Sequence, residues 1–272
     1  MTIHETPDPL TLRLRLPAGR IEITTWDDQR TEVEIDPIED DDASREAAAE
    51  VRQELRQSGG RAELHVESRR GRFGMRRDDP ALLFRISAPH GTSINASSAA
   101  ADVSCQGRAG EVEVSTASGD VVLDEAGEAT VKTVSGDVRI ERVNGRVRCS
   151  TVSGTLDVGH AGGDVSFSTV SGDIRLGSGD ASVAAKAVSG NVTVDRIARG
   201  DAQFQSVSGD ITVGIARGAT LWMDVGTLSG DTHSDLDPVE GASEEREVDL
   251  RLKASSTSGD IRLQRAVERA PV

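Results

Sequence analysis

Aromatic side chains are scarce in this chain of 272 residues: they make up 2% of it, and tyrosine does not occur. Large rings supply much of the contact area in globular cores and in ligand pockets. Because hydrophobic residues reach only 36% in total, the interior has to be built from valine, isoleucine, leucine and alanine. A thin, repetitive core fits this composition better than the large closed core of a globular enzyme.

Cysteine and long apolar runs are also lacking. Only Cys105 and Cys149 are present, and two thiols this far apart indicate no disulfide framework and are compatible with a reducing compartment. The start, MTIHETPDPLTLRLRLPAG, shows neither the cationic nor the apolar part of a signal peptide, and no stretch approaches the roughly 18 apolar residues of a membrane span. We therefore expect a cytoplasmic protein with no membrane span.

Positive charge is in deficit. The chain has 46 acidic and 31 basic residues, which give a formal net charge of -15. A surface of this charge repels phosphate backbones and anionic lipid head groups. Nucleic acid is therefore not an expected partner.

What the chain has in abundance is one repeated phrase, Ser-Gly followed by Asp, Asn or Thr. It begins at Ser118, Ser135, Ser153, Ser171, Ser189, Ser208, Ser229 and Ser258. The Asp position of the phrase recurs with spacings of 18, 17, 18, 18, 18, 19, 21 and 29, counted from Asp102, which follows Ala101 in place of the glycine. A short, nearly fixed period predicts a solenoid in which each repeat is one coil stacked on the next.

Within a repeat the apolar residues alternate and then slip by one. The pattern Val147, Cys149, Thr151 is followed by Val152 and Leu156, with glycine between them at an inward position. One slip per repeat indicates two strands that meet at a bend, with both apolar sets facing one interior. The glycine lets the backbone turn tightly or approach its neighbour. The predicted fold is all-β: a single-stranded parallel β-solenoid with coils of about 18 residues.

The chain divides by regularity into three parts. Residues 1–92 contain strand signals and are predicted to form N-terminal strands or starting coils, residues 93–265 form the regular solenoid, and residues 266–272 form a tail. One amphipathic helix is predicted near residues 41–58, from its acidic start, its alanines and the helical spacing of its apolar residues. This helix either covers an end or face of the solenoid or binds a partner.

Two segments interrupt the strand pattern. The first, residues 69–80, is a basic loop that either is a solvated hairpin or grips an anionic surface. Its arginines are Arg69, Arg70, Arg72, Arg76 and Arg77. The second, residues 232–247, is an acidic loop that contains proline and glycine.

The aspartates of the repeat are the candidate site residues. They have outward parity, so stacking would align them in a ladder of Asp102, Asp120, Asp137, Asp173, Asp210, Asp231 and Asp260. Carboxylates about 4.8 Å apart repel by roughly 1 kcal/mol per pair in water, so something has to offset the repulsion. Either each Asp accepts backbone hydrogen bonds at its own Gly-Asp bend, a role that Asn191 and Thr155 could fill without charge, or the ladder binds cations.

Nothing in the sequence specifies a reaction. The five histidines share no spacing, the two cysteines have inward parity, and no phosphate-binding glycine motif occurs. We therefore predict no catalytic residue, no cofactor and no metal centre. Parallel β-helices can carry carbohydrate-active sites, which keeps a polysaccharide-active enzyme among the alternatives.

The phrases TVSGDV and STSGDI, the half-coil GRVRCSTVSG and the early LRLRLPAGRIEI resemble the bacterial putative-adhesin family of β-solenoid domains of unknown function, from about Leu10 to Leu263. The resemblance implies a non-enzymatic repeat protein, with some relatives tied to the cell envelope and its stress responses, and gives no catalytic residues. We expect an interaction scaffold for an unknown protein partner, or for homo-oligomers through its ends or faces. An envelope-associated adhesin or envelope-stress protein is the first alternative.

Overall fold

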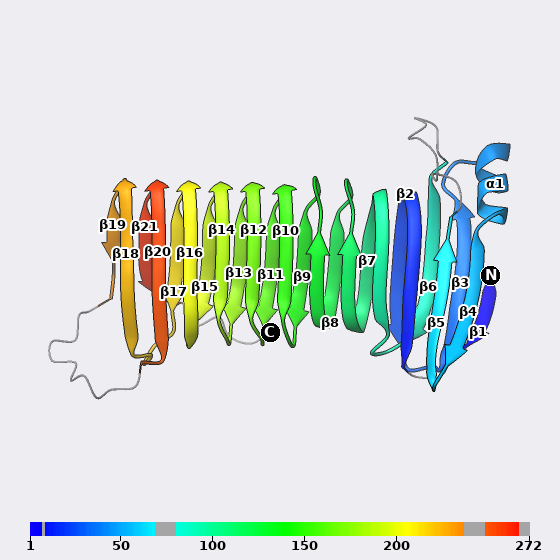
Figure 1. The fold of residues 1–272 in the computed structure, drawn as a ribbon, viewed down its shortest axis with the longest axis horizontal. Helices are drawn as coiled ribbons and strands as arrows, with labels where there is room; N and C mark the ends of the chain where they lie inside the picture. The colour runs from blue at the N-terminus through cyan, green and yellow to red at the C-terminus, as the bar shows by residue number, and fades with distance from the viewer. Residues whose placement is uncertain (7–8, 69–79, 237–247, 267–272) are drawn as a thin grey trace. The chain divides into compact units, whose positions relative to one another are not determined.

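The computed structural model describes residues 1–6, 9–68, 80–236 and 248–266. The fold is all-β, with mostly parallel strands wound as a solenoid and one helix in the described part (Figure 1). The chain forms two compact units, Met1–Ile140 and Glu141–Val272. Each is described by itself.

The second unit consists of two rows of parallel strands, two strands per coil. The first row contains β10 (Val147–Ser153), β12 (Val165–Ser171), β14 (Val183–Ser189), β16 (Gly200–Ser208), β20 (Leu250–Ser258) and β18 (Leu221–Ser229). The second row contains β11 (Leu156–Ala161), β13 (Ile174–Gly179), β15 (Val192–Ile197), β17 (Ile211–Ile215), β21 (Ile261–Arg265) and β19 (Thr232–Ser234).

The register stacks equivalent residues directly on one another. Val147 lies beside Val165 and Val165 beside Val183, 18 positions apart in each step. Inward residues such as Val165 and Leu176 are almost fully buried. Because every strand pairs with its counterpart in the next coil, the backbone hydrogen bonds and the apolar core run along the same direction.

The glycine of the repeated phrase lies where consecutive coils touch. Gly172, Gly190 and Gly209 have φ values of +151°, +146° and +147°. A Cβ atom placed on Gly190 would lie 2.0 Å from the carbonyl oxygen of Gly172, and one on Gly209 would lie 2.1 Å from that of Gly190. The predicted close approach is confirmed, and the left-handed backbone conformation adds a second reason for glycine.

The coils of this unit do not all stack in sequence order, contrary to the prediction. The late strand β20 lies between β16 and β18, and β21 lies between β17 and β19 (Figure 1). The inward residues of β20, among them Leu250 and Leu252, are 0% exposed, whereas Met223 on β18 is 49% exposed. β20 thus occupies a place that is covered on both sides, whereas β18 is covered by β20 on one side.

The residue before the serine of the phrase was predicted to point inward, and this is wrong. Val152, Val170, Val188 and Val207 are 45%, 47%, 48% and 50% exposed. The preceding residue is buried instead, as Thr151 and Thr169 show. The bend therefore comes one residue later than the parity argument placed it, after an outward-facing valine.

The aspartate column binds the coils together through its side chains. The Asp210 carboxylate accepts a hydrogen bond from the backbone N–H of Asp260, at 2.8 Å, and the Asp260 carboxylate accepts one from Asp231, at 2.9 Å. Asn191 does the same with its amide oxygen, which accepts from the N–H of Asp210 at 2.9 Å. The acceptor thus serves the neighbouring coil, and not only its own bend as the sequence suggested.

The first unit is organised around one long strand. β2 (Leu10–Trp26) pairs in parallel with β5 (Arg61–Glu67) and β6 (Leu82–Pro89) on one side and with β7 (Ser93–Ser115) on the other. β7 continues in parallel to β8 (Val121–Lys132), and β9 (Val138–Val143) follows. The leucines of β2, among them Leu12, are nearly inaccessible to solvent because strands cover β2 on both sides.

The start of this unit contains antiparallel pairs as well as coils. β1 (Thr2–Glu5) and β6 both pair antiparallel with β3 (Arg30–Pro37), and β4 (Arg52–Ser58) pairs antiparallel with β5. Antiparallel pairs thus replace some of the expected coils. For β4 and β5 the short connection between two consecutive strands favours antiparallel pairing.

The helix α1 (Asp42–Ala49) is shorter than the predicted segment 41–58. The Asp41 carboxylate caps it by accepting a hydrogen bond from the N–H of Ser44 at 2.6 Å. The second half of the predicted segment forms β4, because the edge of β5 offers it a full row of backbone partners. The helix packs on β3 and β6.

Two predicted loops fall mainly outside the described residues. Of the basic segment 69–80, only residue 80 is described, so its arginines are not placed. The acidic segment 232–247 begins with β19, which is a strand and not a loop, while residues 237–247 lie outside the description. Of the tail, only Ala266 is described.

We predict that Gly190→Ala lowers the free energy of unfolding by roughly 2–4 kcal/mol, because the new methyl group collides with the Gly172 carbonyl in a strained backbone conformation. Urea unfolding of the full chain measures the change. Gly218→Ala is the matched control, since Gly218 also has a positive φ but nothing lies within 4 Å of its added Cβ; it should cost only about 1 kcal/mol. Equal effects would contradict the close-contact explanation.

We predict that Asp210→Ala destabilises the fold by about 1 kcal/mol, because the N–H of Asp260 loses its acceptor. Asp210→Asn keeps an acceptor oxygen and removes one charge from the column, as Asn191 does naturally, so it should be at least as stable as the parent chain. Urea midpoints of the two variants compare them directly. A variant pair with equal loss would show that the charge, and not the acceptor, is what matters.

Candidate binding surfaces

The valine column is the most regular exposed feature of the second unit. Val152, Val170, Val188 and Val207 each project from the end of one strand of the first row, and each is about half exposed. Parallel stacking places neighbouring members about 4.8 Å apart. The column is therefore a continuous apolar ridge, flanked along the chain by the exposed serines of the repeated phrase.

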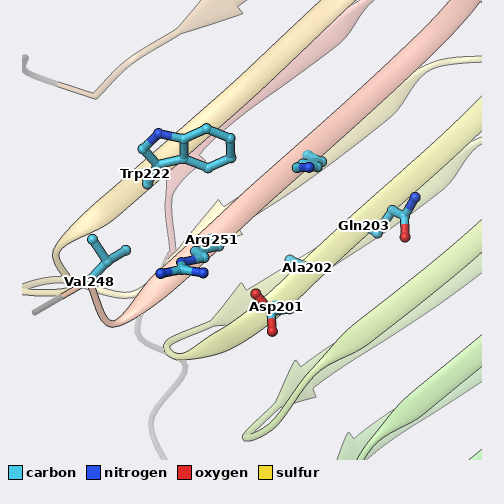
Figure 2. Close-up of a pocket in the computed structure, with 7 residues that line it drawn as sticks. Asp201, Ala202, Gln203, Trp222, Val248 and Arg251 are labelled. Carbon is cyan, nitrogen blue, oxygen red and sulfur yellow. The ribbon is translucent and has the colours of Figure 1, made fainter.

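A hollow of about 440 Å³ lies on the outer face of β16, β20 and β18 (Figure 2). Its lining residues are Asp201, Ala202, Gln203, Trp222, Val248, Arg251 and Lys253. Asp201, Arg251 and Trp222 occupy one row across the three strands, because Asp201 pairs with Arg251 and Arg251 with Trp222. Lys253 belongs to the next row, and its ammonium nitrogen lies 5.8 Å from the centre of the Trp222 ring.

A second hollow, of about 480 Å³, lies in the first unit between β2 and β7. Several of its polar side chains already have partners in the protein. Arg13 forms a charged hydrogen bond with Glu63, and the Asn95 amide donates to Glu113 at 2.8 Å. The Arg13 guanidinium also lowers the pKa of Glu63. Such internally paired groups make this hollow the weaker candidate for a ligand.

The edge of β18 is the third feature. Among the described strands, β18 pairs only with β20, so one side of its backbone carries no strand partner. Met223 and Leu228 on this strand are 49% and 86% exposed. An exposed strand edge with apolar side chains is a template for pairing with another chain.

The aspartates of the ladder lie at the outer side of the bend. Asp102 accepts from the N–H of Asp120 at 3.0 Å, and Asp120 accepts from that of Asp137 at 2.9 Å. Asp173 serves Asn191 in the same way, at 3.0 Å. No group of three or more potential metal ligands occurs among the described residues. The ladder carboxylates thus have a structural use.

The two cysteine thiols lie in the core. Cys105 and Cys149 are 2% and 1% exposed. Burial, with a smaller contribution from the charge of Asp124, raises the pKa of Cys105 to about 12. A thiol with this pKa stays protonated near neutral pH and is a poor nucleophile.

His160 and His233 contact residues of the same or adjacent coils. The His160 Nδ1 lies 2.8 Å from the Ser178 hydroxyl, and its Nε2 lies 3.8 Å from the Asp180 carboxylate. His233 lies 2.7 Å from Asp235. Ser178, His160 and Asp180 bring a hydroxyl, an imidazole and a carboxylate together, but 3.8 Å is longer than the hydrogen bond by which a carboxylate orients a catalytic imidazole.

Sequence reasoning missed both the ridge and the hollow. The ridge valines were assigned to the core by parity. The Trp222 hollow needed the pairing of β20 with both β16 and β18, which sequence order does not suggest. A usable signal was nevertheless present, because the chain has only two tryptophans and Trp222 alternates with Leu221 and Met223 on an expected strand.

Three solved structures similar to this chain are of bacterial proteins. A putative adhesin from Bacteroides fragilis is 12% identical over 96% of this chain and 95% of its own, with a TM-score of 0.50. A putative adhesin from Parabacteroides distasonis is 10% identical over 96% and 95%, with a TM-score of 0.38. A putative cell adhesion protein from Clostridium sporogenes is 11% identical over 97% and 98%, with a TM-score of 0.29.

At these identities the likeness to the Bacteroides fragilis protein concerns the fold alone. A search of curated proteins found no match to the chain. In the described part of the chain, no helix has both the length and the apolar character needed to cross a membrane. The model of one protein family matches residues 14–264. With its repeated bend, stacked glycines and parallel coils in place, the chain belongs to the Toastrack DUF4097 family.

Proposed function

We propose that this protein is a non-enzymatic, adhesin-like interaction scaffold built from coils of about 18 residues. The observation that carries the proposal is the valine ridge of Val152, Val170, Val188 and Val207, which is exposed in four successive coils. Exposed apolar side chains that recur at a fixed spacing do not contribute to the core and are typical of a protein-binding face. The burial of both cysteines supports a role without thiol catalysis.

The ridge suits an extended apolar segment of a protein partner. Its members form a straight row one strand apart, so a partner can contact several of them with one strand or one helix face. The serines beside the valines are exposed and can exchange hydrogen bonds with the partner's polar rim.

A site-specific crosslink tests the ridge. We predict that the photo-crosslinking residue p-benzoylphenylalanine at Val188 yields a discrete protein adduct in the native host, whereas the same residue at the outward-facing Ser166 does not. Adding Val170→Asp should lower the Val188 adduct at least about ten-fold, since burial of one valine is worth roughly 1.5–3 kcal/mol.

The control for charge alone is Ser166→Asp, which should leave the Val188 adduct intact. An adduct that survives Val170→Asp, or one that forms equally from both crosslinking positions, would contradict a specific partner on the ridge.

We also propose that two copies associate through β18. If β18 paired antiparallel with β18 of a second copy, the backbone groups at its unpaired edge would gain hydrogen-bond partners. A two-fold axis would relate the two strands, so Met223 would be covered in both copies. The strand LWMDVGTLS has only one charged residue, Asp224, and no proline, so it lacks the usual devices that discourage edge pairing.

Light scattering during size-exclusion chromatography tests this association. We predict a dimer for the parent chain and a monomer for Met223→Lys, because the lysine places a charge at the pairing edge. Val122→Lys, at a residue of β8 that is 42% exposed, is the control and should remain dimeric. A parent chain that is monomeric over a wide concentration range would refute the proposal.

The cellular location is proposed as cytoplasmic, on the support of two buried thiols and an acidic composition. The alternative is an adhesin or stress protein of the cell envelope, which the Bacteroides fragilis putative adhesin supports. Fractionation of the native host and detection of the untagged protein separates them: we expect the soluble cytosol. Recovery in the membrane or medium would favour the envelope role.

A further inference from the structure

The exposed tryptophan of the second unit differs from the other aromatic residues of the described part. Phe84, Phe167 and Phe204 are at most 2% exposed and belong to the core, whereas Trp222 is 45% exposed. Trp26 of the first unit donates its indole N–H to the carbonyl of Arg30 at 3.0 Å. Among the aromatic residues that the structure describes, Trp222 thus presents the most exposed ring to solvent, and Trp26 is partly buried.

Two cations stand beside this ring. Arg251 projects from β20 to the same side as Trp222 on β18 (Figure 2), and Lys253 of the same strand lines the same hollow. In the described part of the chain, neither takes part in an ion pair, although the chain has a net charge of -15 and offers many carboxylates. Lys253 instead lies over the Trp222 ring, at 5.8 Å from its centre. A guanidinium that is not neutralised is ready to bind a carboxylate through two parallel hydrogen bonds.

The far side of the hollow is lined by one acidic and one uncharged polar side chain. Asp201 and Gln203 project from β16, one strand beyond Arg251 and Lys253 (Figure 2). A carboxylate accepts hydrogen bonds from hydroxyl groups, and an amide both donates and accepts. The hollow of about 440 Å³ falls within the range of small-ligand sites.

These features together select one ligand chemistry. A pyranose ring has an apolar C–H face that stacks on an indole, and hydroxyl groups that match Asp201 and Gln203. A carboxylate on that sugar matches Arg251 and Lys253. A neutral sugar would leave both cations without a partner, while a phosphate group carries more negative charge toward Asp201.

We propose that Trp222, Arg251, Lys253, Asp201 and Gln203 form a binding site for an acidic saccharide that contains hexuronate units. The site lies on the outer face of three strands and is independent of the valine ridge and of β18 pairing. If the saccharide does not bind, the scaffold proposal is therefore unaffected. No bond is made or broken in it, since the site holds the sugar by stacking and charged hydrogen bonds.

Because the chain has only two tryptophans, one substitution leaves Trp222 as its single fluorescent indole. In Trp26→Phe, Trp222 is the only indole of the full chain, and we expect a saturable change of its fluorescence on titration with tetragalacturonate. The fully methyl-esterified tetramer keeps the rings and removes the charge, so it should bind at least about ten-fold more weakly, as expected when charged hydrogen bonds are lost. Added salt should weaken binding of the acidic tetramer.

Variants assign the residues. Arg251→Gln should lower affinity for the acidic tetramer at least about ten-fold and leave the weak binding of the ester unchanged, whereas Trp222→Ala should weaken both. Saturation-transfer NMR on these chains supplies a readout that needs no tryptophan, and the urea midpoint verifies that each variant is folded. Arg148→Gln, at an outward position of β10, is the matched control and should bind like the parent.

No saturable response to tetragalacturonate would overturn the proposal. Equal affinity for the acid and its ester would overturn the acidic ligand class, and an Arg251→Gln chain that binds like the parent would overturn the assigned geometry.

Discussion

The structure depends on one constraint, the close in-register stacking of parallel coils about 4.8 Å apart. Within that spacing a position in one coil determines what its neighbours can be. The Gly172 carbonyl leaves no room for a side chain at residue 190, and the Gly190 carbonyl leaves none at residue 209. The same requirement recurs in each coil, which explains why the phrase is repeated in the sequence.

The same spacing creates an electrostatic difficulty that the structure resolves with hydrogen bonds. Stacked aspartates repel, yet each ladder carboxylate lies where the N–H of the next coil needs an acceptor, as between Asp210 and Asp260. The bend turns this N–H away from the carbonyl groups that pair the strands, so a side chain has to replace a backbone acceptor. Asn191 supplies the same oxygen without the charge, which identifies the acceptor as the shared requirement.

The fold class and the repeat could be predicted because a period near 18 and an alternation of two leave few other architectures. The order of the coils could not, because β18 and β20 carry the same phrase and only their relative burial separates Met223 from Leu252. The bend was misplaced by one residue, since parity cannot tell whether Thr151 or Val152 is the last residue before the turn. The helix was overextended because Val51 and Leu55 fit a helical spacing, while the edge of β5 offered the same segment a longer row of backbone partners.

The candidate surfaces follow from the rows that stacking leaves free. Inward rows have to fill the core, and the bend has to keep its glycine and its acceptor, so only the outward rows can differ between coils. One outward row consists of Gln203, Lys253 and Asp224, and the neighbouring row consists of Asp201, Arg251 and Trp222. In neither row do equivalent positions of the coils hold the same type of residue. Their composition is therefore not explained by stacking. In sequence order Trp222 would lie between Asp201 and Arg251, whereas the observed order places Arg251 between Asp201 and Trp222, so the irregular coil order determines how the groups of the proposed saccharide site are arranged.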